Sequence, residues 1–132
     1  VSEGGAGEVL VGNLDLERDF TDVRDGVTAL RKVMELEDPM AAYNVASGRP
    51  TRIRQILAWI LHEAGIEHEN HVDSSRLREN EDACIQGDAS RLMIDTGWVP
   101  LRSLESSVRE VYRWTARRWE RGSTGLGEGG IG

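Results

Sequence analysis

The sequence predicts an α/β fold with few short strands and about four helices. Short apolar segments bounded by glycine or proline alternate with segments whose apolar residues recur every three to four positions. The 132 residues are 39% apolar and 30% charged, which is enough for one domain with a modest core. The predicted order is strand, helix, strand, helix, strand, helix, helix. So few strands indicate a piece of a larger α/β protein rather than a complete parallel sheet.

The first predicted strand and helix lie in the N-terminal third. The segment EVLVG, residues 8–12, predicts a short strand that Gly12 ends. Asp22 is a suitable N-cap for the following helix, which ends before Pro39 because proline disfavours helical geometry at the residue before it. The helix carries a predicted apolar stripe of Val23, Val27, Leu30 and Met34, widened by Val33 and Leu36.

A second strand and helix follow. The segment AAYNVAS, residues 41–47, predicts a strand stopped by Gly48 and Pro50. Thr51 is a suitable cap for the next helix, and Gly65 is a suitable end. The apolar stripe of this helix is the most regular in the chain and consists of Ile53, Ile56, Leu57, Ile60, Leu61 and Ala64.

The last part of the chain alternates less clearly. IEHENHV, residues 66–72, predicts an edge strand, and an irregular polar stretch follows from Asp73 to Gln86. Asp88 is a suitable cap for a short helix that Gly97 ends, and a last helix begins at Ser103. We expect that helix to bury Leu104, Val108, Val111, Tyr112, Thr115 and Trp119 along one side.

The two ends differ in composition from the middle. We expect residues 1–8 to be flexible and the Gly-rich residues 122–132 to be disordered, which leaves residues 9–121 as the folded domain.

Composition restricts the partners and the compartment. The net charge of −7 argues against nucleic acid as a general partner. The longest apolar run, ILAWIL, covers six residues, so we expect no membrane span, and VSEGGAGEVL lacks the basic and apolar regions of a signal peptide. A lone cysteine, Cys84, cannot form an internal disulfide, which favours a cytoplasmic location.

Familiar catalytic and cofactor motifs do not occur in a suitable context. No glycine-rich phosphate loop follows a predicted strand, because the glycines at 125–132 follow the last helix, and no G-x-S-x-G elbow is present. His62, His68 and His71 lack a complete ligand set, so we expect exposed histidines rather than a metal site.

Three arginines in predicted loops remain as candidates. Arg18 opens the charged stretch RDFTDVRD after the first strand, Arg49 follows the second, and Arg78 lies in the irregular stretch. A guanidinium presents a planar fork of donors that suits phosphate oxygens. Composition and spacing alone leave both a solvated surface and an anion-binding site open.

Three ordered motifs give the chain a family resemblance. VGNLDLERDFTDVRDGV, YNVASGRPTRIRQIL and RLRENEDACIQGDASRLMIDTGWVP follow one another as in the C-terminal part of extended short-chain dehydrogenase/reductases acting on nucleotide sugars. The chain most resembles GDP-mannose 4,6-dehydratase and GDP-4-keto-6-deoxymannose reductase, from about Val9 to Trp119.

The resemblance implies substrate-binding roles for several residues. In the family, the arginine of the R-D-F motif reaches the diphosphate of the nucleotide sugar, and Arg18 occupies that position. The arginine of the R-P-x-D segment contacts the same diphosphate, and the strand before R-D-F lies near the base. The implied substrate-binding residues are Arg18, Arg78, Asn13, Val11 and, as the weakest match, Arg49.

Two departures from the family pattern matter. Beside Arg78, Glu79 replaces the proline and Glu81 the aspartate of R-P-x-D. The family also binds NAD(P) on an N-terminal Rossmann domain and reacts through a Y-x-x-x-K pair. Neither Tyr43 nor Tyr112 is followed four residues later by lysine.

The resemblance therefore implies the substrate-binding part of an NAD(P)-dependent nucleotide-sugar dehydratase, reductase or epimerase, inactive alone. We expect no cofactor, metal or catalytic residues on this chain, and a GDP-sugar as its ligand. Its other expected partner is the missing Rossmann domain or another copy of the chain. The alternative is a truncated stand-alone module for binding or assembly without enzymatic activity.

Overall fold

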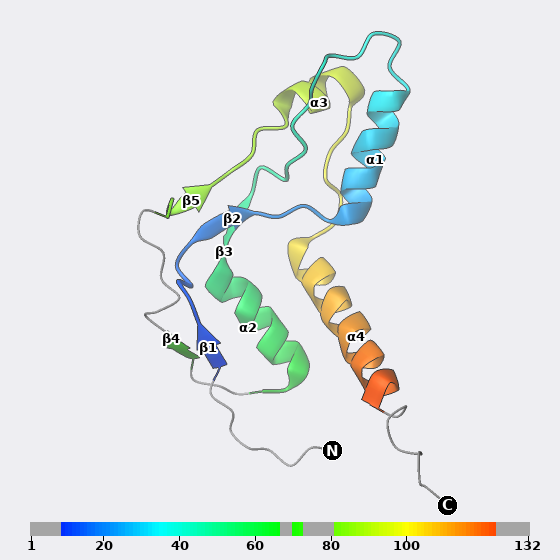
Figure 1. Cartoon of the computed structure of the whole chain (residues 1–132). Helices are drawn as coiled ribbons and strands as arrows, with labels where there is room; N and C mark the ends of the chain where they lie inside the picture. The colour runs from blue at the N-terminus through cyan, green and yellow to red at the C-terminus, as the bar shows by residue number, and fades with distance from the viewer. Residues whose placement is uncertain (1–8, 67–69, 73–80, 124–132) are drawn as a thin grey trace, which may run out of the picture.

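The computed structural model describes residues 9–66, 70–72 and 81–123 (Figure 1). Its elements are β1 (Val9–Val11), β2 (Glu17–Asp19), α1 (Val23–Met34), β3 (Pro50–Arg52), α2 (Ile53–Ala64), β4 (Asn70–Val72), β5 (Cys84–Ile85), α3 (Ser90–Thr96) and α4 (Leu104–Ser123). The predicted mixed α/β class with short strands is confirmed, and the described residues form four helices.

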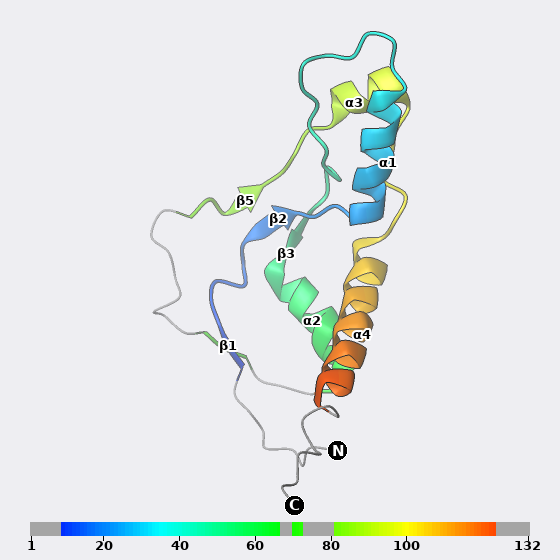
Figure 2. The same cartoon turned by 45° about the vertical axis from the view of Figure 1, so that its right-hand side comes forward.

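The strands form two small sheets. One pairs β1 with β4 in parallel, and the other has the order β3-β2-β5. Within the second sheet β2 is antiparallel to β3 and parallel to β5, so Arg18 lies opposite Thr51 on one side and Ile85 on the other. Figure 2 shows α1 and α3 at one end of the molecule and α2 and α4 at the other, with β2 and β3 between them.

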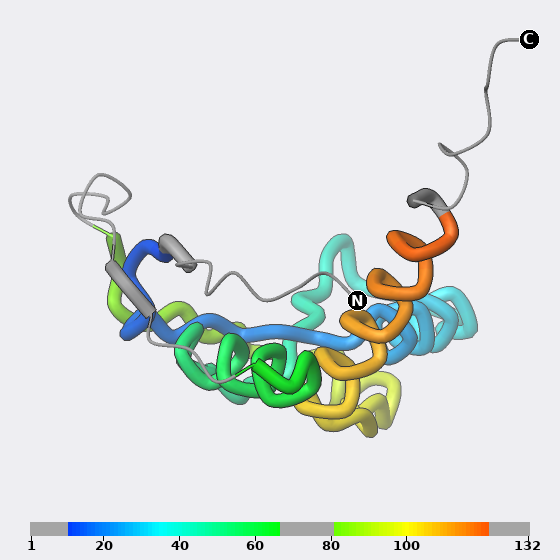
Figure 3. Tube along the Cα trace, turned by 90° about the horizontal axis from the view of Figure 1, so that it is seen from below, coloured from blue at the N-terminus to red at the C-terminus, as the bar shows by residue number. Residues whose placement is uncertain are grey.

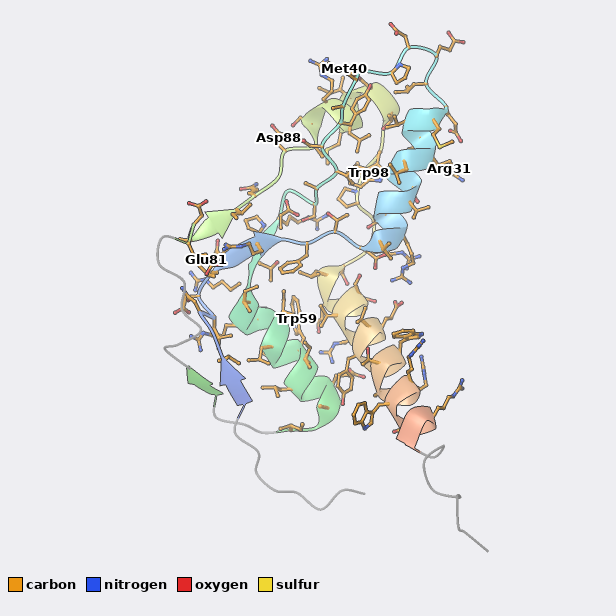
Figure 4. The ribbon with its side chains drawn as sticks, viewed as in Figure 1. Arg31, Met40, Trp59, Glu81, Asp88 and Trp98 are labelled. Atoms are coloured by element: carbon orange, nitrogen blue, oxygen red, sulfur yellow. The ribbon has the colours of Figure 1, made fainter. Side chains whose placement is uncertain are left out.

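The core at the α1–α3 end is built around one tryptophan. Trp98 is 1% exposed and packs with Leu92 and three buried alanines. Its indole Nε1 donates to the backbone carbonyl of Asp25 at 2.9 Å, which joins the segment after α3 to the first turn of α1 (Figure 4). The buried Asp25 carboxylate accepts from the backbone N–H groups of Leu101 and Arg102. These three hydrogen bonds join segments that are 73 to 77 residues apart in the sequence.

The predicted apolar stripe of α1 faces away from this core. Val23, Val27, Leu30 and Met34 are 60–84% exposed, whereas the buried positions of the helix are Asp25 and Ala29. The periodicity therefore predicted the helix correctly, but the described core covers its opposite side. An exposed apolar face of this kind is characteristic of a surface that another partner covers.

Helices α2 and α4 lie side by side (Figure 3) and are joined by charged side chains. The Glu63 carboxylate binds Arg113 Nε at 2.6 Å and Arg109 Nη1 at 2.7 Å. Hydrogen bonds from Arg113 and then Arg109 lower the pKa of Glu63, so this link is charged at neutral pH. Next to it, an apolar groove of about 740 Å³ runs between the start of α1, α2 and α4.

Only part of the predicted α4 stripe is covered. Leu104, Val108 and Tyr112 are half-buried, but Val111, Thr115 and Trp119 are exposed. This prediction was wrong for the second half of the helix, because α2 has 12 residues against the 20 of α4 and cannot cover its full length.

The predicted strand at 41–47 is also wrong. These residues take irregular backbone and make no strand pairing, but individual contacts hold them, such as Tyr43 Oη donating to Asp95 Oδ2 at 2.9 Å. The strand lies instead at Pro50–Arg52, where the backbone pairs with β2, and Thr51 is part of that strand rather than a helix cap. Apolar composition alone did not identify which segment has a pairing partner.

Most predicted helix ends are confirmed. Asp22 caps α1 by accepting from Arg24 N, and Gly65 and Gly97 take the left-handed conformation that ends α2 and α3. Asp88 lies one residue before the N-cap of α3, and its side chain accepts from the N–H and hydroxyl of Ser90. No helix in the described part of the chain is both long and apolar enough to cross a membrane.

Candidate functional site

Arg18 lies at the centre of the three-stranded sheet, in β2, and not in a loop as the sequence suggested. Its Nη1 donates to the backbone carbonyls of Glu17 at 2.8 Å and Asp82 at 2.9 Å. Two carbonyl acceptors orient the guanidinium plane, and the side chain remains 21% exposed. The Arg18 side chain, the candidate anion-binding group, is therefore held in place while part of it faces solvent.

A carboxylate occupies one side of this guanidinium. Arg18 Nη2 lies 3.1 Å from Glu81 Oε1, and Figure 4 shows Glu81 beside β2 and β5. An anion that binds Arg18 has to replace this carboxylate or use the other N–H donors of the guanidinium, which carries five in all. The neighbouring Glu17 is itself paired with Arg52 at 3.0 Å, so these two residues balance each other's charge.

Asp19, the next residue of β2, accepts four hydrogen bonds. Its donors are Ser47 N, Ser47 Oγ, Gly48 N and Gly87 N, at distances of 2.6–3.1 Å. Burial alone would raise the pKa of Asp19, but the combined bonds from Ser47, Gly87 and Gly48 outweigh it and lower that pKa. The carboxylate is therefore ionised at neutral pH, and its charge is taken up by these donors.

Arg49 is exposed and lies in a different part of the surface. It lines a small cavity of about 110 Å³ together with Asp22, Asp25 and Arg102, near the starts of α1 and α4. Arg18 instead reaches Glu81 and Asp82 on the β5 side. The structure does not bring the two arginines to one site in the part of the chain that it describes.

The other three candidates have less structural support. Asn13 is exposed, and its Oδ1 accepts from Asp15 N at 3.0 Å, which forms a local turn between β1 and β2. Val11 is half-buried at the end of β1. Arg78 lies outside the described residues.

The starts of α1, α2 and α3 do not suit the pyrophosphate of a dinucleotide. Such a group needs a glycine turn that exposes backbone N–H groups at a helix N-terminus. Asp22 places a carboxylate at the start of α1, and Asp88 places one at the start of α3. Helix α2 begins directly after β3 without any glycine. These described strand-to-helix connections therefore do not fit NAD(P).

The histidines give no metal site within the residues that the structure describes, where no group of three or more ligating side chains gathers. His62 is exposed, and its Nδ1 lies 3.3 Å from Arg109 Nη1. His68 and the side chain of His71 lie outside the described residues.

Comparison with known proteins gives the family. The protein-family model described as GDP-mannose 4,6 dehydratase matches residues 1–111 of this chain. The chain belongs to this family. It is 33% identical over 113 residues to GDP-6-deoxy-D-mannose reductase of Pseudomonas aeruginosa, covering 85% of this chain and 37% of the reductase.

Solved structures agree with this family assignment. A Pseudomonas aeruginosa structure described as RMD complexed with NADPH superimposes with a TM-score of 0.73 at 32% identity, covering 83% of this chain and 36% of that one. A putative epimerase from Burkholderia cenocepacia superimposes with a TM-score of 0.76 at 29% identity, again covering 83% of this chain and 36% of that one. The chain thus spans little more than a third of these relatives, which is consistent with the predicted C-terminal portion.

Sequence reasoning from spacing alone missed two residues that shape the site. Asp19 was one of several aspartates in a charged stretch, and the partners of its carboxylate are 28 to 68 residues away. Gly87 matches no local turn pattern in the sequence. The structure nevertheless requires glycine there, because a Cβ would lie 2.3 Å from the Cβ of Ala46. A single sequence contains no signal for such distant contacts.

Proposed function

We propose that residues 9–121 form the nucleotide-sugar-binding part of an NAD(P)-dependent dehydratase, reductase or epimerase of this family, acting on a GDP-sugar in the cytoplasm. The observation that carries the proposal is the arrangement of Arg18. A guanidinium held by two backbone carbonyls and still partly exposed can bind phosphate oxygens without first losing much side-chain freedom.

The relatives supply the chemical class of the ligand. The matched curated relative is named as a GDP-6-deoxy-D-mannose reductase, and its solved relative is described as complexed with NADPH. In this proposal the described residues hold the nucleotide sugar, and NAD(P) binds to another part of the family enzyme. The chain's own role is to bind and orient the nucleotide sugar, with Arg18 as the main ligand of the diphosphate and Arg78 as a further candidate there. Asn13 and Val11 are candidates for the region near the base, and Arg49 is the weakest candidate.

Replacing Arg18 with alanine tests this role. We expect GDP binding to weaken by about 1.5–3 kcal/mol, because a hydrogen bond to a charged group contributes roughly that much. Isothermal titration calorimetry with GDP and GDP-mannose measures the change, and UDP tests the preference for guanine. Arg18→Lys keeps the charge but not the planar fork, so we expect intermediate affinity.

Arg52→Ala is the matched control for this titration. Arg52 lies on the neighbouring strand β3, and it pairs with Glu17 as Arg18 pairs with Glu81. Like Arg18→Ala, Arg52→Ala removes one positive charge from this sheet, but we expect it to bind GDP with near-wild-type affinity. If the two variants lose affinity equally, the effect is one of net charge, and Arg18 is not the specific ligand.

The exposed stripe of α1 predicts self-association of the isolated chain. Val23 lines the groove between α1, α2 and α4, and Val27, Leu30 and Met34 continue the exposed apolar stripe along α1, so a second copy can bury this surface. We expect a dimer or larger oligomer in light scattering at micromolar concentration. Leu30→Glu is expected to shift the equilibrium toward monomer, and a wild-type chain that stays monomeric contradicts the prediction.

A further inference from the structure

The strands around Arg18 are too short to fix its position by backbone pairing alone. The β2–β5 ladder has two residue pairs and the β2–β3 ladder has three. Isolated ladders of this size are marginal in water. Something else must hold β3 and β5 against β2 if Arg18 is to keep one orientation.

The Asp19 carboxylate makes these additional connections. Oδ1 accepts from the N–H and hydroxyl of Ser47, at 2.9 and 2.6 Å, and Oδ2 accepts from Gly48 N and Gly87 N, at 2.8 and 3.1 Å. Ser47 and Gly48 lie just before β3, and Gly87 lies just after β5. One side chain on the central strand therefore bonds to the segments next to both neighbouring strands, at the same end of the sheet.

The two loops that Asp19 joins also contact each other closely. Gln86 Nε2 donates to the Gly48 carbonyl at 2.8 Å. The position of Gly87 has no room for a side chain, because a Cβ would lie 2.3 Å from Ala46 Cβ. The Gly87 backbone thus packs directly against Ala46, the residue before Ser47.

The opposite end of the ladder is held by Arg18 itself. Its guanidinium bonds to the Asp82 carbonyl and to Glu81, just before β5. Arg18 and Asp19 therefore fasten the two ends of β5 to β2, and a shift at the Asp19 end changes where the guanidinium lies. We infer that Asp19 is a positioning residue that fixes Arg18 for diphosphate binding, an inference that rests on the proposed function.

Electrostatics and positioning predict opposite results for Asp19→Asn. Removing a negative charge beside an anion-binding arginine should by itself strengthen GDP binding. The amide, however, turns N–H donors toward backbone N–H groups that need an acceptor, so the two loops separate from β2. If positioning dominates, GDP binding weakens, by about tenfold for a displacement of this kind.

Calorimetric titration of the full chain with GDP tests this. We expect weaker binding for Asp19→Asn and a smaller loss, below about tenfold, for Ser47→Ala, which removes only one of the four donors to Asp19. Glu63→Gln breaks the α2–α4 ion pairs far from Arg18 and should bind as the wild type does. Unchanged or tighter binding by Asp19→Asn overturns the inference, and if that variant fails to fold, wild-type affinity in Ser47→Ala overturns it.

Ligand-free NMR separates this inference from the proposed function. In Asp19→Asn we expect the amide protons of Gly48 and Gly87 to move upfield and the guanidinium signals of Arg18 to shift, while the amide signals of α4 stay in place. Arg18 signals identical to those of the wild type overturn the positioning role. If Arg18→Ala leaves GDP affinity unchanged, the diphosphate role of Arg18 is wrong, and the positioning inference falls with it.

Discussion

Replacing Trp98 with alanine is expected to lower the free energy of unfolding by about 3–5 kcal/mol, the usual cost of removing a buried aromatic ring. Trp98 is the largest fully buried side chain in the described part of the molecule. Its neighbours in the core are mostly alanines, which are too small to fill the space left behind. Urea unfolding followed by circular dichroism measures the change.

Two further variants separate the parts of this effect. Trp98→Phe keeps most of the ring but loses the bond from Nε1 to the Asp25 carbonyl, so we expect a loss of about 1–2 kcal/mol beyond the change in packing. Trp114 is exposed and stacks with Arg118, 5.3 Å from the ring centroid. Its replacement by alanine should cost about 1 kcal/mol or less, and an equal loss for Trp98 and Trp114 would contradict the core described here.

The second large effect is acid destabilisation through Asp22. Its carboxylate makes a paired contact with Arg24, at 2.8–2.9 Å, and accepts from the Ser107 hydroxyl of α4. The side-chain bond from Arg24 lowers the pKa of Asp22 well below its usual range, and it outweighs the opposing effect of burial. Because the folded state binds this proton more weakly than the unfolded state, the stability that Asp22 contributes is complete above the unfolded pKa of about 4. It is lost as pH falls further toward the folded pKa.

We expect Asp22→Ala to lose about 3 kcal/mol at pH 7, since it removes a helix cap and leaves its partners without their acceptor. Asp22→Asn retains the cap oxygen but not the charge, so it should lose less. Both variants should also show a smaller drop in stability between pH 5 and pH 3 than the wild type, measured by urea unfolding at each pH. If the stability of the wild type and of both variants falls in parallel with pH, Asp22 is not the carboxylate responsible for the acid destabilisation.

Local rules predicted the helices well because their signals are local. Asp22, Gly65 and Gly97 act within one turn of the helix ends that they define, and the structure confirms all three. The strands were harder, because pairing with a distant segment decides whether an extended segment becomes a strand. Residues 41–47 are apolar but irregular, whereas the polar segment Glu17–Asp19 forms the central strand of a sheet.

The candidate site was predictable only through the resemblance. Spacing placed Arg18 in a loop, and nothing in its neighbourhood distinguished it from a solvated arginine. The family motif identified it, and the structure adds the two carbonyls that orient it and the carboxylate of Asp19 beside it. These contacts span up to 68 residues and depend on how the loops fold back onto β2.

The outward stripe of α1 also has a thermodynamic consequence for the chain in isolation. The heat capacity and denaturant dependence of unfolding both scale with the apolar surface that becomes newly hydrated. Val23, Val27, Leu30 and Met34 are already largely hydrated in the folded chain, and they add little to either quantity. As a monomer, the chain should therefore unfold over a broad range of temperature and urea, with an m-value and a heat-capacity change below those usual for 132 residues. Burying the stripe against a partner should sharpen both transitions.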